Sequence, residues 1–309
     1  MTSFPIISRE TPVVVFTNPF AGRGRSTSQI VRAKKAFEHA GIPVEFQASA
    51  ELGEFRAKVS EVVVRNQRLL LALGGDGSFH HLVNATFGED VVVGLLPAGG
   101  GNDLAMALRL KRDFSDIPQL IKEQKTVFLD ALRVRTSDGG ERLCVVNAGA
   151  GLDAEAARLA GTRYRAVYGR LRYVLSVLQA FRRFIPCKMQ IEFADEPGRT
   201  VLETLLFAGT LNAQTCGGGI RVAPNADVTD GLLDLVMLKK LNVLEVLRIL
   251  PELVFRGQVR TGRLTTIQTK KVKISSEEPC LFQGDGEILG HTPVEIEVIP
   301  RAIRVLGAQ

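Results

Sequence analysis

The stretch from Leu69 to Leu108 contains two consecutive strand–loop–helix patterns, and it constrains the fold more than any other feature of the chain. In the first, an apolar run ends at the loop GGDGS. In the second, an apolar run ends at PAGGGND, and a helical pattern follows each loop. Strands that are apolar on both faces are typical of the buried centre of a parallel sheet. The sequence therefore predicts an α/β domain with glycine loops at the carboxyl ends of neighbouring strands.

These two loops have the composition of an anion-binding site. Successive glycine amides and the start of a helix offer unpaired N–H groups and a positive dipole end. Asp76 is unusual there, because a bare carboxylate repels phosphate, so it indicates a bound cation or hydrogen bonding that fixes the loop. One such loop would equally well be a tight turn, but two in succession predict a nucleotide-phosphate site.

The residues before this stretch repeat the alternation of strand and helix. Apolar runs at 13–16 and 44–46 predict strands, and the patterns at 26–40 and 53–66 predict helices. A third glycine loop, NPFAGRG, follows the first strand. Alternating elements at short spacing imply a parallel, right-handed, three-layer α/β domain. We place this domain at residues 1–126.

Beyond residue 126 the pattern changes to short β-branched runs separated by turn residues, which predicts a mostly antiparallel β domain over residues 127–309. Helical patterns at 164–184 and 244–255 interrupt the strands. The pattern leaves open whether the last strand, 303–306, returns to the first domain. The cleft between the two domains is the expected place for chemistry.

Composition indicates an ordinary folded protein, with 45% hydrophobic and 23% charged residues. The amino-terminal segment lacks the pattern of a signal peptide, and we find no apolar run long enough to span a bilayer. The four cysteines are scattered without paired spacing, so we expect reduced thiols in a cytosolic protein. Neither they nor the four histidines suggest zinc.

The net charge of +6 is unevenly distributed. No acidic residue occurs from Ala156 through Ile191, whereas arginines and a lysine recur there. Nucleic acid, an anionic membrane surface and a merely solvated helix face are the three interpretations of such a basic segment. The helical pattern at 164–184 also carries an apolar stripe, which suits either a core-facing helix or one that lies on a membrane.

The order of the motifs resembles a known family. GGDGS followed by PAGGGNDLA is similar to the catalytic domain of the diacylglycerol kinase and sphingosine kinase family, in its soluble bacterial form. GGDG[ST] alone is shared with NAD kinases and phosphofructokinases, but the P-x-G-x-x-N-D segment points to the lipid kinases. NPFAGRG resembles the segment that opens this family, and the resemblance extends over about residues 13–306.

The resemblance implies an ATP- and Mg²⁺-dependent lipid kinase that phosphorylates a lipid hydroxyl, with conversion of diacylglycerol to phosphatidic acid as the first expectation. It assigns ATP binding to three loops and to one serine after the second strand. The residues are Asn18, Pro19, Phe20, Ala21, Gly22, Ser49, Gly74, Gly75, Asp76, Gly77, Ser78, Phe79, His80, Gly100, Asn102 and Asp103. Asp76 would also act in catalysis by helping to organise the metal–triphosphate.

Two acidic turns in the second domain complete the implied site. By resemblance, Asp230 is a magnesium ligand, with Asp227 and Leu232 as carbonyl donors, an oxygen-only set that suits this ion. Glu287 is the general base for the lipid hydroxyl, and Asp285 stands beside it. Taken without the resemblance, both segments are Asp-Gly turns between strands.

Two departures from the family pattern keep alternatives open. Gly100 stands where the family usually has Thr or Ser, and His81 stands where it usually has Glu. A sphingoid base or ceramide remains open as the substrate, because no motif reads the acyl chains. A soluble NAD kinase or sugar kinase is a second alternative, and a catalytically silent nucleotide- or lipid-binding regulator is a third.

The resemblance also implies where such a protein works. We expect a cytoplasmic protein that makes peripheral contact with the inner face of the membrane, where its lipid substrate lies, and that has no nucleic-acid partner. The family includes dimers, so a homodimer is open as well.

Overall fold

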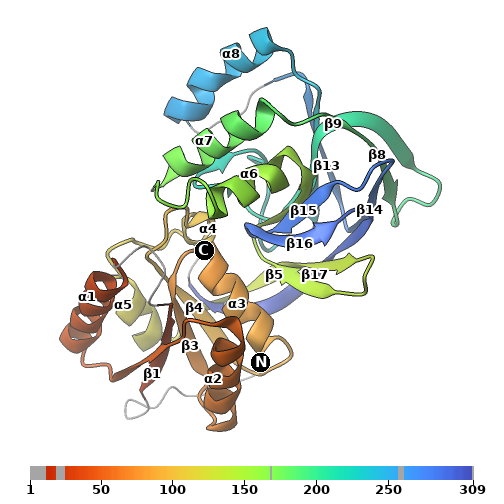
Figure 1. Cartoon of the computed structure of the whole chain (residues 1–309). Helices are drawn as coiled ribbons and strands as arrows, with labels where there is room; N and C mark the ends of the chain where they lie inside the picture. The colour runs from red at the N-terminus through yellow and green to blue at the C-terminus, as the bar shows by residue number, and fades with distance from the viewer. Residues whose placement is uncertain (1–11, 19–24, 168, 257–260, 308–309) are drawn as a thin grey trace. The chain divides into compact units, whose positions relative to one another are not determined.

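The structure is a computed structural model that describes residues 12–18, 25–167, 169–256 and 261–307. The chain forms two compact units (Figure 1). Unit 1 comprises Met1–Leu129 with Ala302–Gln309, and unit 2 comprises Asp130–Arg301. The chain passes between the units within two long strands, β5 (Thr126–Thr136) and β17 (Val294–Leu306).

Unit 1 is built on a parallel sheet with the order β2-β1-β3-β4, followed by the end of β17. The strands before β17 are β1 (Val13–Thr17), β2 (Val44–Ala48), β3 (Leu69–Gly74) and β4 (Val92–Pro97). Every residue of β1, β3 and β4 is buried, as expected for strands covered on both faces. Val305 of β17 pairs in parallel with Val93 of β4, so the last strand of the chain extends this sheet.

Helices cover both faces of the sheet in unit 1, which gives three layers (Figure 1). The helices are α1 (Arg25–Ala40), α2 (Leu52–Val64), α3 (Asp76–Thr86), α4 (Asp103–Ala107) and α5 (Ile117–Lys122). Helix α1 contacts α5 on one face, and α2 contacts α3 on the other. The predicted three-layer α/β domain is therefore confirmed.

Unit 2 is dominated by antiparallel strands in the order β16-β15-β7-β9-β8-β14-β17. They are β7 (Asn147–Gly151), β8 (Cys187–Phe193), β9 (Thr200–Leu211), β14 (Lys271–Ser276), β15 (Leu281–Gly284) and β16 (Glu287–His291). Strand β12 (Leu233–Lys239) pairs with β9 and with β13 (Leu264–Thr269), and β6 (Glu141–Cys144) pairs with β5. Strands β10 (Thr215–Cys216) and β11 (Ile220–Arg221) form a separate two-stranded sheet. The predicted antiparallel character of the second domain is confirmed.

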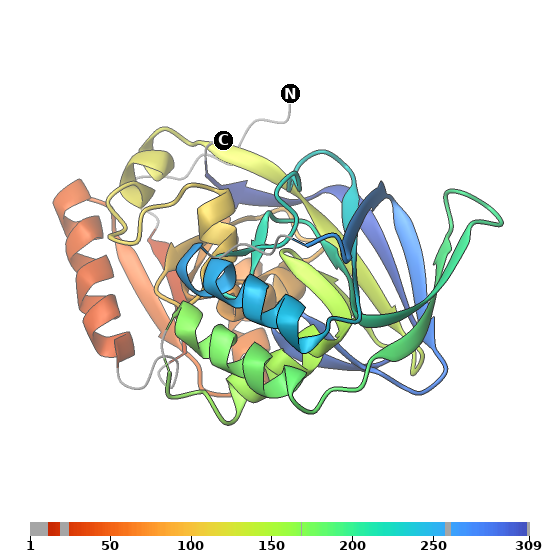
Figure 2. The ribbon, with the colours of Figure 1, turned by 90° about the horizontal axis from the view of Figure 1, so that it is seen from above.

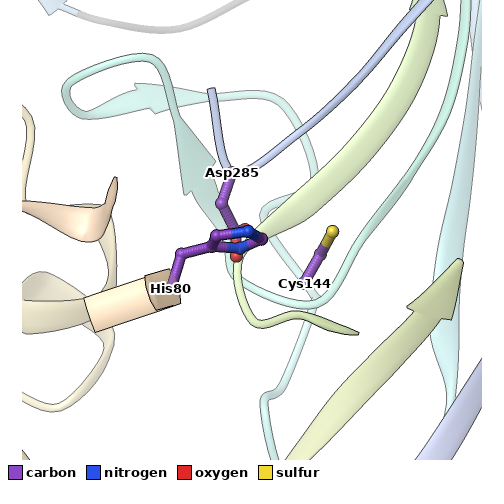
Figure 3. A group of neighbouring side chains, drawn as sticks. All are labelled: His80, Cys144 and Asp285. Atoms are coloured by element: carbon purple, nitrogen blue, oxygen red, sulfur yellow. The ribbon is translucent and has the colours of Figure 1, made fainter. Parts of the chain in front are cut away.

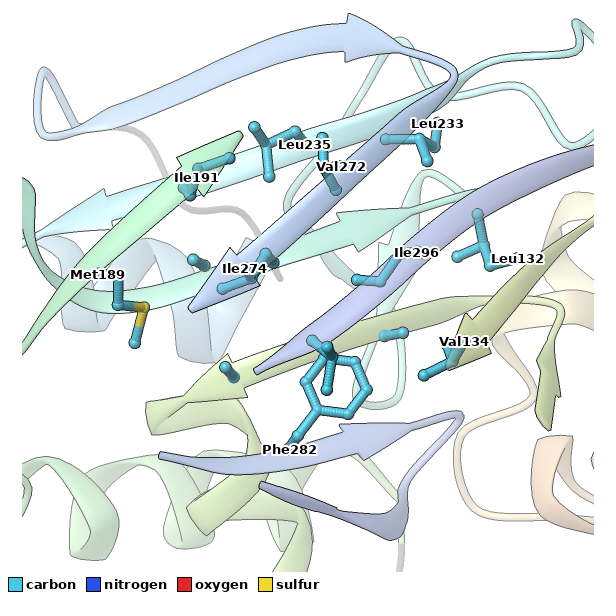
Figure 4. Close-up of a cluster of buried hydrophobic side chains, with 14 of the residues drawn as sticks. Leu132, Val134, Met189, Ile191, Leu233, Leu235, Val272, Ile274, Phe282 and Ile296 are labelled. Carbon is cyan, nitrogen blue, oxygen red and sulfur yellow. The ribbon is translucent and has the colours of Figure 1, made fainter. Parts of the chain in front are cut away.

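The core of unit 2 lies between layers of these strands (Figure 4). Buried and less buried residues alternate along β8 and β14, which is the period of a strand with one apolar face. Met189 and Ile191 of β8, Ile274 of β14 and Phe282 of β15 all project into this core.

Three helices of unit 2 lie beside one another, α6 (Leu152–Gly161), α7 (Arg170–Phe181) and α8 (Val243–Pro251), and the π-helical turn η1 (Glu252–Arg256) continues α8 (Figure 2). The single helix predicted over 164–184 is shorter in the structure, because Gly169, at φ 70°, precedes its first turn. Helix α6 was not predicted. None of the helices in the described ranges is long and apolar enough to cross a membrane.

The cysteine prediction was wrong for one pair. Cys187 of β8 and Cys280, just before β15, form a disulfide although 93 residues separate them in sequence. Neither Cys144 nor Cys216 is disulfide-bonded. Sequence spacing carried no sign of the pair, because antiparallel pairing within the sheet brings the two residues together.

A matched pair of phenylalanines tests this core. Phe282 is fully buried, whereas the side chain of Phe255 in η1 is 82% exposed. We expect Phe282→Ala to lower the free energy of unfolding by about 3–5 kcal/mol, because it opens a cavity. Phe255→Ala is expected to change it by no more than about 0.5 kcal/mol in aqueous buffer. Denaturant unfolding of both variants measures the difference, and equal losses would contradict this core assignment.

Candidate functional site

The loops of unit 1 that carry the predicted nucleotide contacts lie at one edge of its sheet. Thr17 pairs with both Ala48 and Leu73, and Gly74 pairs with Pro97, all in parallel register. The residues that follow these pairs therefore leave the carboxyl ends of four adjacent strands. Ligands of open α/β sheets gather at that edge.

The two glycine loops of the central stretch are packed backbone against backbone. A Cβ atom placed on Gly99 would lie 2.4 Å from the Cα of Gly75, closer than any side chain can approach. The amides of Ala98 and Gly99 donate to the carbonyl of Gly74 at 2.8 and 3.0 Å. Only glycine at position 99 permits this approach, so the second loop is held directly on the first.

Asn102 closes the second loop on itself. Its side-chain oxygen accepts from the amide of Gly99 at 3.0 Å, and its side-chain nitrogen donates to the carbonyl of Gly99 at 2.9 Å. Asn102 adopts a left-handed backbone conformation at φ 63°, which asparagine tolerates better than most residues. Its side chain is buried and engaged, which gives it a structural task in the loop.

Asp76 joins the first loop to the helix that follows the second. Its two carboxylate oxygens accept from the amides of Asp103 and Leu104 at 3.1 and 3.0 Å. These amides belong to the first turn of α4, where backbone N–H groups lack helical partners. The carboxylate thus fixes the loop, which is one of the two explanations that the sequence allowed.

The remaining predicted contacts of unit 1 differ in exposure. Asn18 is exposed after β1, and the hydroxyl of buried Ser49 donates to the Glu51 carbonyl and to the Glu54 carboxylate, both at 3.0 Å. Phe79 and His80 are buried in α3, so they can offer a ligand mainly their backbone. Gly77, Ser78 and Gly100 are half-buried. The predicted contacts Pro19, Phe20, Ala21 and Gly22 lie outside the described residues.

In unit 2, the segment that carries the predicted base is a tight hairpin turn. Asp285 and Gly286 have φ values of 50° and 88°, and they connect β15 to β16 through the pair Gly284–Glu287. Two successive residues with positive φ are typical of a type I′ turn, which matches the twist of a hairpin. The sequence predicted a turn here but placed the second strand at 294–298, and β16 was missed.

Asp285 anchors this hairpin. Its carboxylate accepts from the amides of Val145, Val146 and Asn147 at 2.8, 2.8 and 3.1 Å, and its own amide donates to the carbonyl of Asn147 at 2.9 Å. Cys144 lies beside it (Figure 3). Burial, together with the charge of Asp285, raises the pKa of the Cys144 thiol, so this cysteine stays protonated and unreactive.

Glu287, the first residue of β16, is exposed, in contrast to Asp285. Its backbone is held in the hairpin by the pairing with Gly284, whereas its carboxylate faces solvent. The turn therefore separates two tasks, since one acid anchors the backbone and the other is presented on a rigid strand. An accessible carboxylate of this kind can accept a proton from a bound alcohol.

A side-chain pair that was not predicted from the sequence, Gln283 and Asp153, supports the same turn. The side-chain amide of Gln283 donates to Asp153 of α6 at 2.8 Å, and its oxygen accepts from the amide of Gly286 at 2.9 Å. Burial raises the pKa of Asp153 to about 7, and the hydrogen bond from Gln283 opposes that rise. Gln283 thus connects the start of α6 to the hairpin.

The second acidic turn of unit 2 gathers several carboxylates. Asp227 is exposed and accepts from the amide and hydroxyl of Thr229 at 3.0 and 2.8 Å, and Asp230 accepts from the amide of Leu232 at 2.9 Å. Burial, and then the charges of Asp227 and Asp130, raise the pKa of Asp230. Within the described part of the chain, these acids do not form a compact three-carboxylate group, so a cation there would also need backbone carbonyls.

Asp130 is the residue of this site that sequence reasoning missed. It is fully buried, and its carboxylate accepts from the amides of Gly231 and Arg301 at 2.6 and 2.7 Å. It therefore holds the turn that presents Asp230. The available signal was a single acid, Asp130, inside the otherwise mostly apolar segment 127–134.

The donor chemistry of this turn fits a magnesium ion. Carboxylates whose neighbouring charges raise a pKa are stabilised by a bound cation, and oxygen donors are what Mg²⁺ prefers. Burial and the charge of Asp230 also raise the pKa of Asp234, although a hydrogen bond from Gln268 opposes that rise. Asp227, Asp230 and Leu232 occupy one short segment, as the proposed ligand set requires.

The packing of the two glycine loops gives the first test of this site. We expect Gly99→Ala to lower the free energy of unfolding by about 1–3 kcal/mol, because the new methyl group overlaps the backbone of Gly75. Gly53→Ala in α2 is the matched control, since a Cβ there meets nothing within 4 Å, and helix propensity favours alanine by up to about 1 kcal/mol. Thermal unfolding separates the two, and tolerance of Gly99→Ala would contradict the contact.

Asp153 predicts a pH-dependent stability. Its folded pKa of about 7 exceeds the ordinary value of 3.8, so the native state retains a proton that the unfolded chain releases. The free energy of unfolding should therefore fall as pH rises from about 4 to 7, by on the order of 4 kcal/mol relative to Asp153→Asn, which does not titrate. Urea unfolding of both proteins from pH 4 to 8.5 measures this, and parallel pH profiles would refute it.

Comparisons with known proteins agree with this geometry. Residues 12–134 match the diacylglycerol kinase catalytic domain, and residues 145–307 match the YegS C-terminal NAD kinase beta sandwich-like domain. The chain is 26% identical over 297 residues to the diacylglycerol kinase of Mycobacterium tuberculosis (strain ATCC 25618 / H37Rv), which covers 95% of this chain and 94% of that protein.

Another relative is the diacylglycerol kinase of Bacillus subtilis (strain 168), which is 26% identical over 296 residues and covers 94% of this chain and 95% of its own. A crystal structure of a diacylglycerol kinase from Bacillus anthracis str. Sterne has a TM-score of 0.71, with 96% of this chain and 97% of that chain covered. At 16% identity this last likeness shows the fold alone. Since the YegS C-terminal model alone matches more than half of the chain, and the diacylglycerol kinase model matches most of the rest, this protein belongs to the diacylglycerol kinase-like family of lipid kinases.

Proposed function

We propose that this lipid kinase transfers the γ-phosphoryl group of ATP to the free hydroxyl of diacylglycerol, which yields phosphatidic acid and ADP. The observation that carries the proposal is the pair of interlocked glycine loops, Gly74–Gly77 and Gly99–Gly101, at the carboxyl edge of a parallel sheet. Such loops present backbone N–H groups to phosphate oxygens. The names of the relatives from Mycobacterium tuberculosis and Bacillus subtilis support diacylglycerol as the acceptor.

The nucleotide is assigned to unit 1. The start of α3, capped by Gly75, offers N–H groups and a positive dipole end to the phosphates. Asp76 keeps this start next to that of α4 through its two amide contacts, so its contribution to catalysis is to position the loops. Phosphoryl transfer gains most from such positioning and from neutralised charge, because its transition state is loose.

Proton transfer is assigned to Glu287 of unit 2. The lipid hydroxyl oxygen attacks the γ-phosphorus, the bond from that phosphorus to the β–γ bridging oxygen breaks, and the hydroxyl proton passes to the Glu287 carboxylate. The exposed carboxylate and its rigid hairpin support this role. Asp285 and Gln283 serve it by holding the turn.

Magnesium is assigned to the acidic turn of unit 2. Asp230 would hold the ion through its carboxylate, and Asp227 and Leu232 through their carbonyls. When bound, Mg²⁺ would relieve the repulsion among the acids of this turn and supply positive charge. Asp130 positions the turn through the amide of Gly231.

The proposed setting follows from the substrate. A long-chain lipid alcohol lies in a bilayer, so we propose a cytoplasmic protein that binds the inner membrane face peripherally, with no nucleic-acid partner. A homodimer stays a proposal of the same kind. A sphingoid base or ceramide is the alternative acceptor, since nothing in the described loops distinguishes acyl chains.

A second candidate function is a regulator that binds nucleotide or lipid without turnover. Gly100 supplies no side-chain hydroxyl, and the ring of His81 lies 5.5 Å from that of His80 and 6.4 Å from that of Phe55. His81 thus takes part in an aromatic cluster where the family pattern has a glutamate. The enzyme assay below decides between the two.

The test is Mg²⁺-dependent transfer of labelled γ-phosphate to diacylglycerol, sphingosine, ceramide or monoacylglycerol in mixed micelles, with NAD in the absence of lipid as a further arm. We expect labelled phosphatidic acid, and a loss of about 10²–10⁴-fold in kcat for Glu287→Gln, because the general base is removed. Glu278→Gln, another exposed glutamate of unit 2, should retain full activity.

Each other outcome has a definite meaning. Labelled sphingosine or ceramide phosphate would replace diacylglycerol as the substrate. Labelled NAD without lipid would overturn the choice of a lipid substrate. ATP binding with no labelled product, unchanged by Glu287→Gln, would favour the regulator.

A further inference from the structure

The exposed face of α8 and η1 carries large apolar side chains. A helix that only covers a core would expose polar side chains instead. Leu244, Leu247 and Pro251 follow the spacing of one helical stripe, and Phe255 continues it in η1. The side chains of Leu244, Leu247 and Phe255 are 78%, 58% and 82% exposed. A surface helix normally turns its apolar stripe toward the core, as α8 does with buried Ile249 on its other side.

The exposed charged residues of α8 and η1 are both arginines. Arg248 and Arg256 are exposed among the apolar side chains of the stripe. The two acids of α8 and η1, Glu245 and Glu252, are only partly exposed, and Glu245 is neutralised by Arg263 at 2.9 Å. A hydrogen bond from the amide of Asn242, and the contact with Arg263, lower the pKa of that carboxyl, so its charge is compensated within the protein.

The helix is held firmly enough to present this stripe. Asn242 and Glu245 form a reciprocal capping box at its first turn, with hydrogen bonds of 2.9 and 2.8 Å. The turn η1 contacts α7, and both views draw α7 and α8 side by side (Figures 1 and 2). The stripe is therefore part of an ordered surface.

The segment after α7 also exposes both basic and apolar side chains. Arg182 and Arg183 are exposed there, and Ile185 is one of the most exposed apolar side chains of unit 2. Among the residues that the structure describes, Arg182, Arg183, Arg248 and Arg256 form no ion pair. Their charge is therefore available to an anionic partner.

We propose that this surface, Leu244, Leu247, Arg248, Phe255 and Arg256, is where the protein docks on an anionic phospholipid bilayer. Leucine and phenylalanine side chains would enter the interface between head groups and acyl chains, while the arginines would contact lipid phosphates. The inference rests on the proposed function, because a kinase of a bilayer lipid needs such a face. The membrane contact is thus proposed for α8 and η1, whereas the sequence had suggested the helix predicted over 164–184.

Charge complementarity favours a bilayer over a second copy of the chain. A symmetric dimer contact places the same patch of both subunits together, so the unpaired arginines would face one another. An anionic lipid surface instead attracts every one of them.

The absence of tryptophan from the chain permits a direct test. Phe255→Trp in the full-length protein places a single fluorophore on the stripe, and Leu202→Trp on β9 is the matched control, because Leu202 is 58% exposed. Each protein is mixed with vesicles of phosphatidylcholine alone or with 30% phosphatidylglycerol, without ATP. We expect a blue shift, and quenching by brominated acyl chains, only for Phe255→Trp with the anionic vesicles.

Substitutions on the stripe measure its contribution. Leu247→Ser with Phe255→Ser, and separately Arg248→Glu with Arg256→Glu, should each weaken co-sedimentation with anionic vesicles by tenfold or more. Phosphorylation of a short-chain diacylglycerol dispersed in water should be unaffected. If the wild-type protein does not phosphorylate the short-chain diacylglycerol either, the proposed function fails, and the docking surface is not what failed.

Two results would overturn the docking surface. One is equal quenching of Phe255→Trp and Leu202→Trp. The other is unchanged vesicle binding by both double variants, and if sedimentation velocity then showed that they dissociate a dimer, the stripe would be a subunit interface.

Discussion

Hydrogen bonds from backbone amides to acidic side chains hold the functional segments of this protein in place. Asp76 in unit 1, and Asp130 and Asp285 in unit 2, each accept two or three of them. Each acid joins segments that are far apart in sequence, up to 171 residues for Asp130 and Arg301. A carboxylate that is buried, as in Asp130 and Asp285, or partly buried, as in Asp76, is costly unless such donors compensate it. Each anchor therefore depends on the geometry that it stabilises.

This division of labour explains why neighbouring acids have different tasks. The carboxylate of Asp285 accepts hydrogen bonds from three amides, whereas Glu287, two residues later, remains exposed on the strand that follows. Asp130 is buried under a turn, whereas Asp230, on that turn, stays accessible to a cation. In both cases a buried acid fixes the backbone, and the exposed acid is the one to which the proposed function assigns chemistry.

Apolar residues show a similar contrast between unit 2's interior and its surface. Phe282 and Ile274 lie in the core between strands, as the alternating pattern of those strands requires. Leu244 and Phe255 follow an equally regular helical pattern and yet face solvent. Periodicity identifies the apolar face of an element but not what covers it, and for α8 we infer that the cover is a membrane.

The sequence by itself determined the elements whose signals are local. The glycine loops, the parallel order of strand and helix in unit 1, the antiparallel character of unit 2 and the Asp285–Gly286 turn all follow from a few adjacent residues. Only the tertiary structure decided the partners. The amides bound by Asp130 and Asp285, the contact of Asp153 with Gln283, the Cys187–Cys280 disulfide and strand β16 depend on which distant segments meet. Those contacts are set by chain topology and packing, so they cannot be predicted from local periodicity.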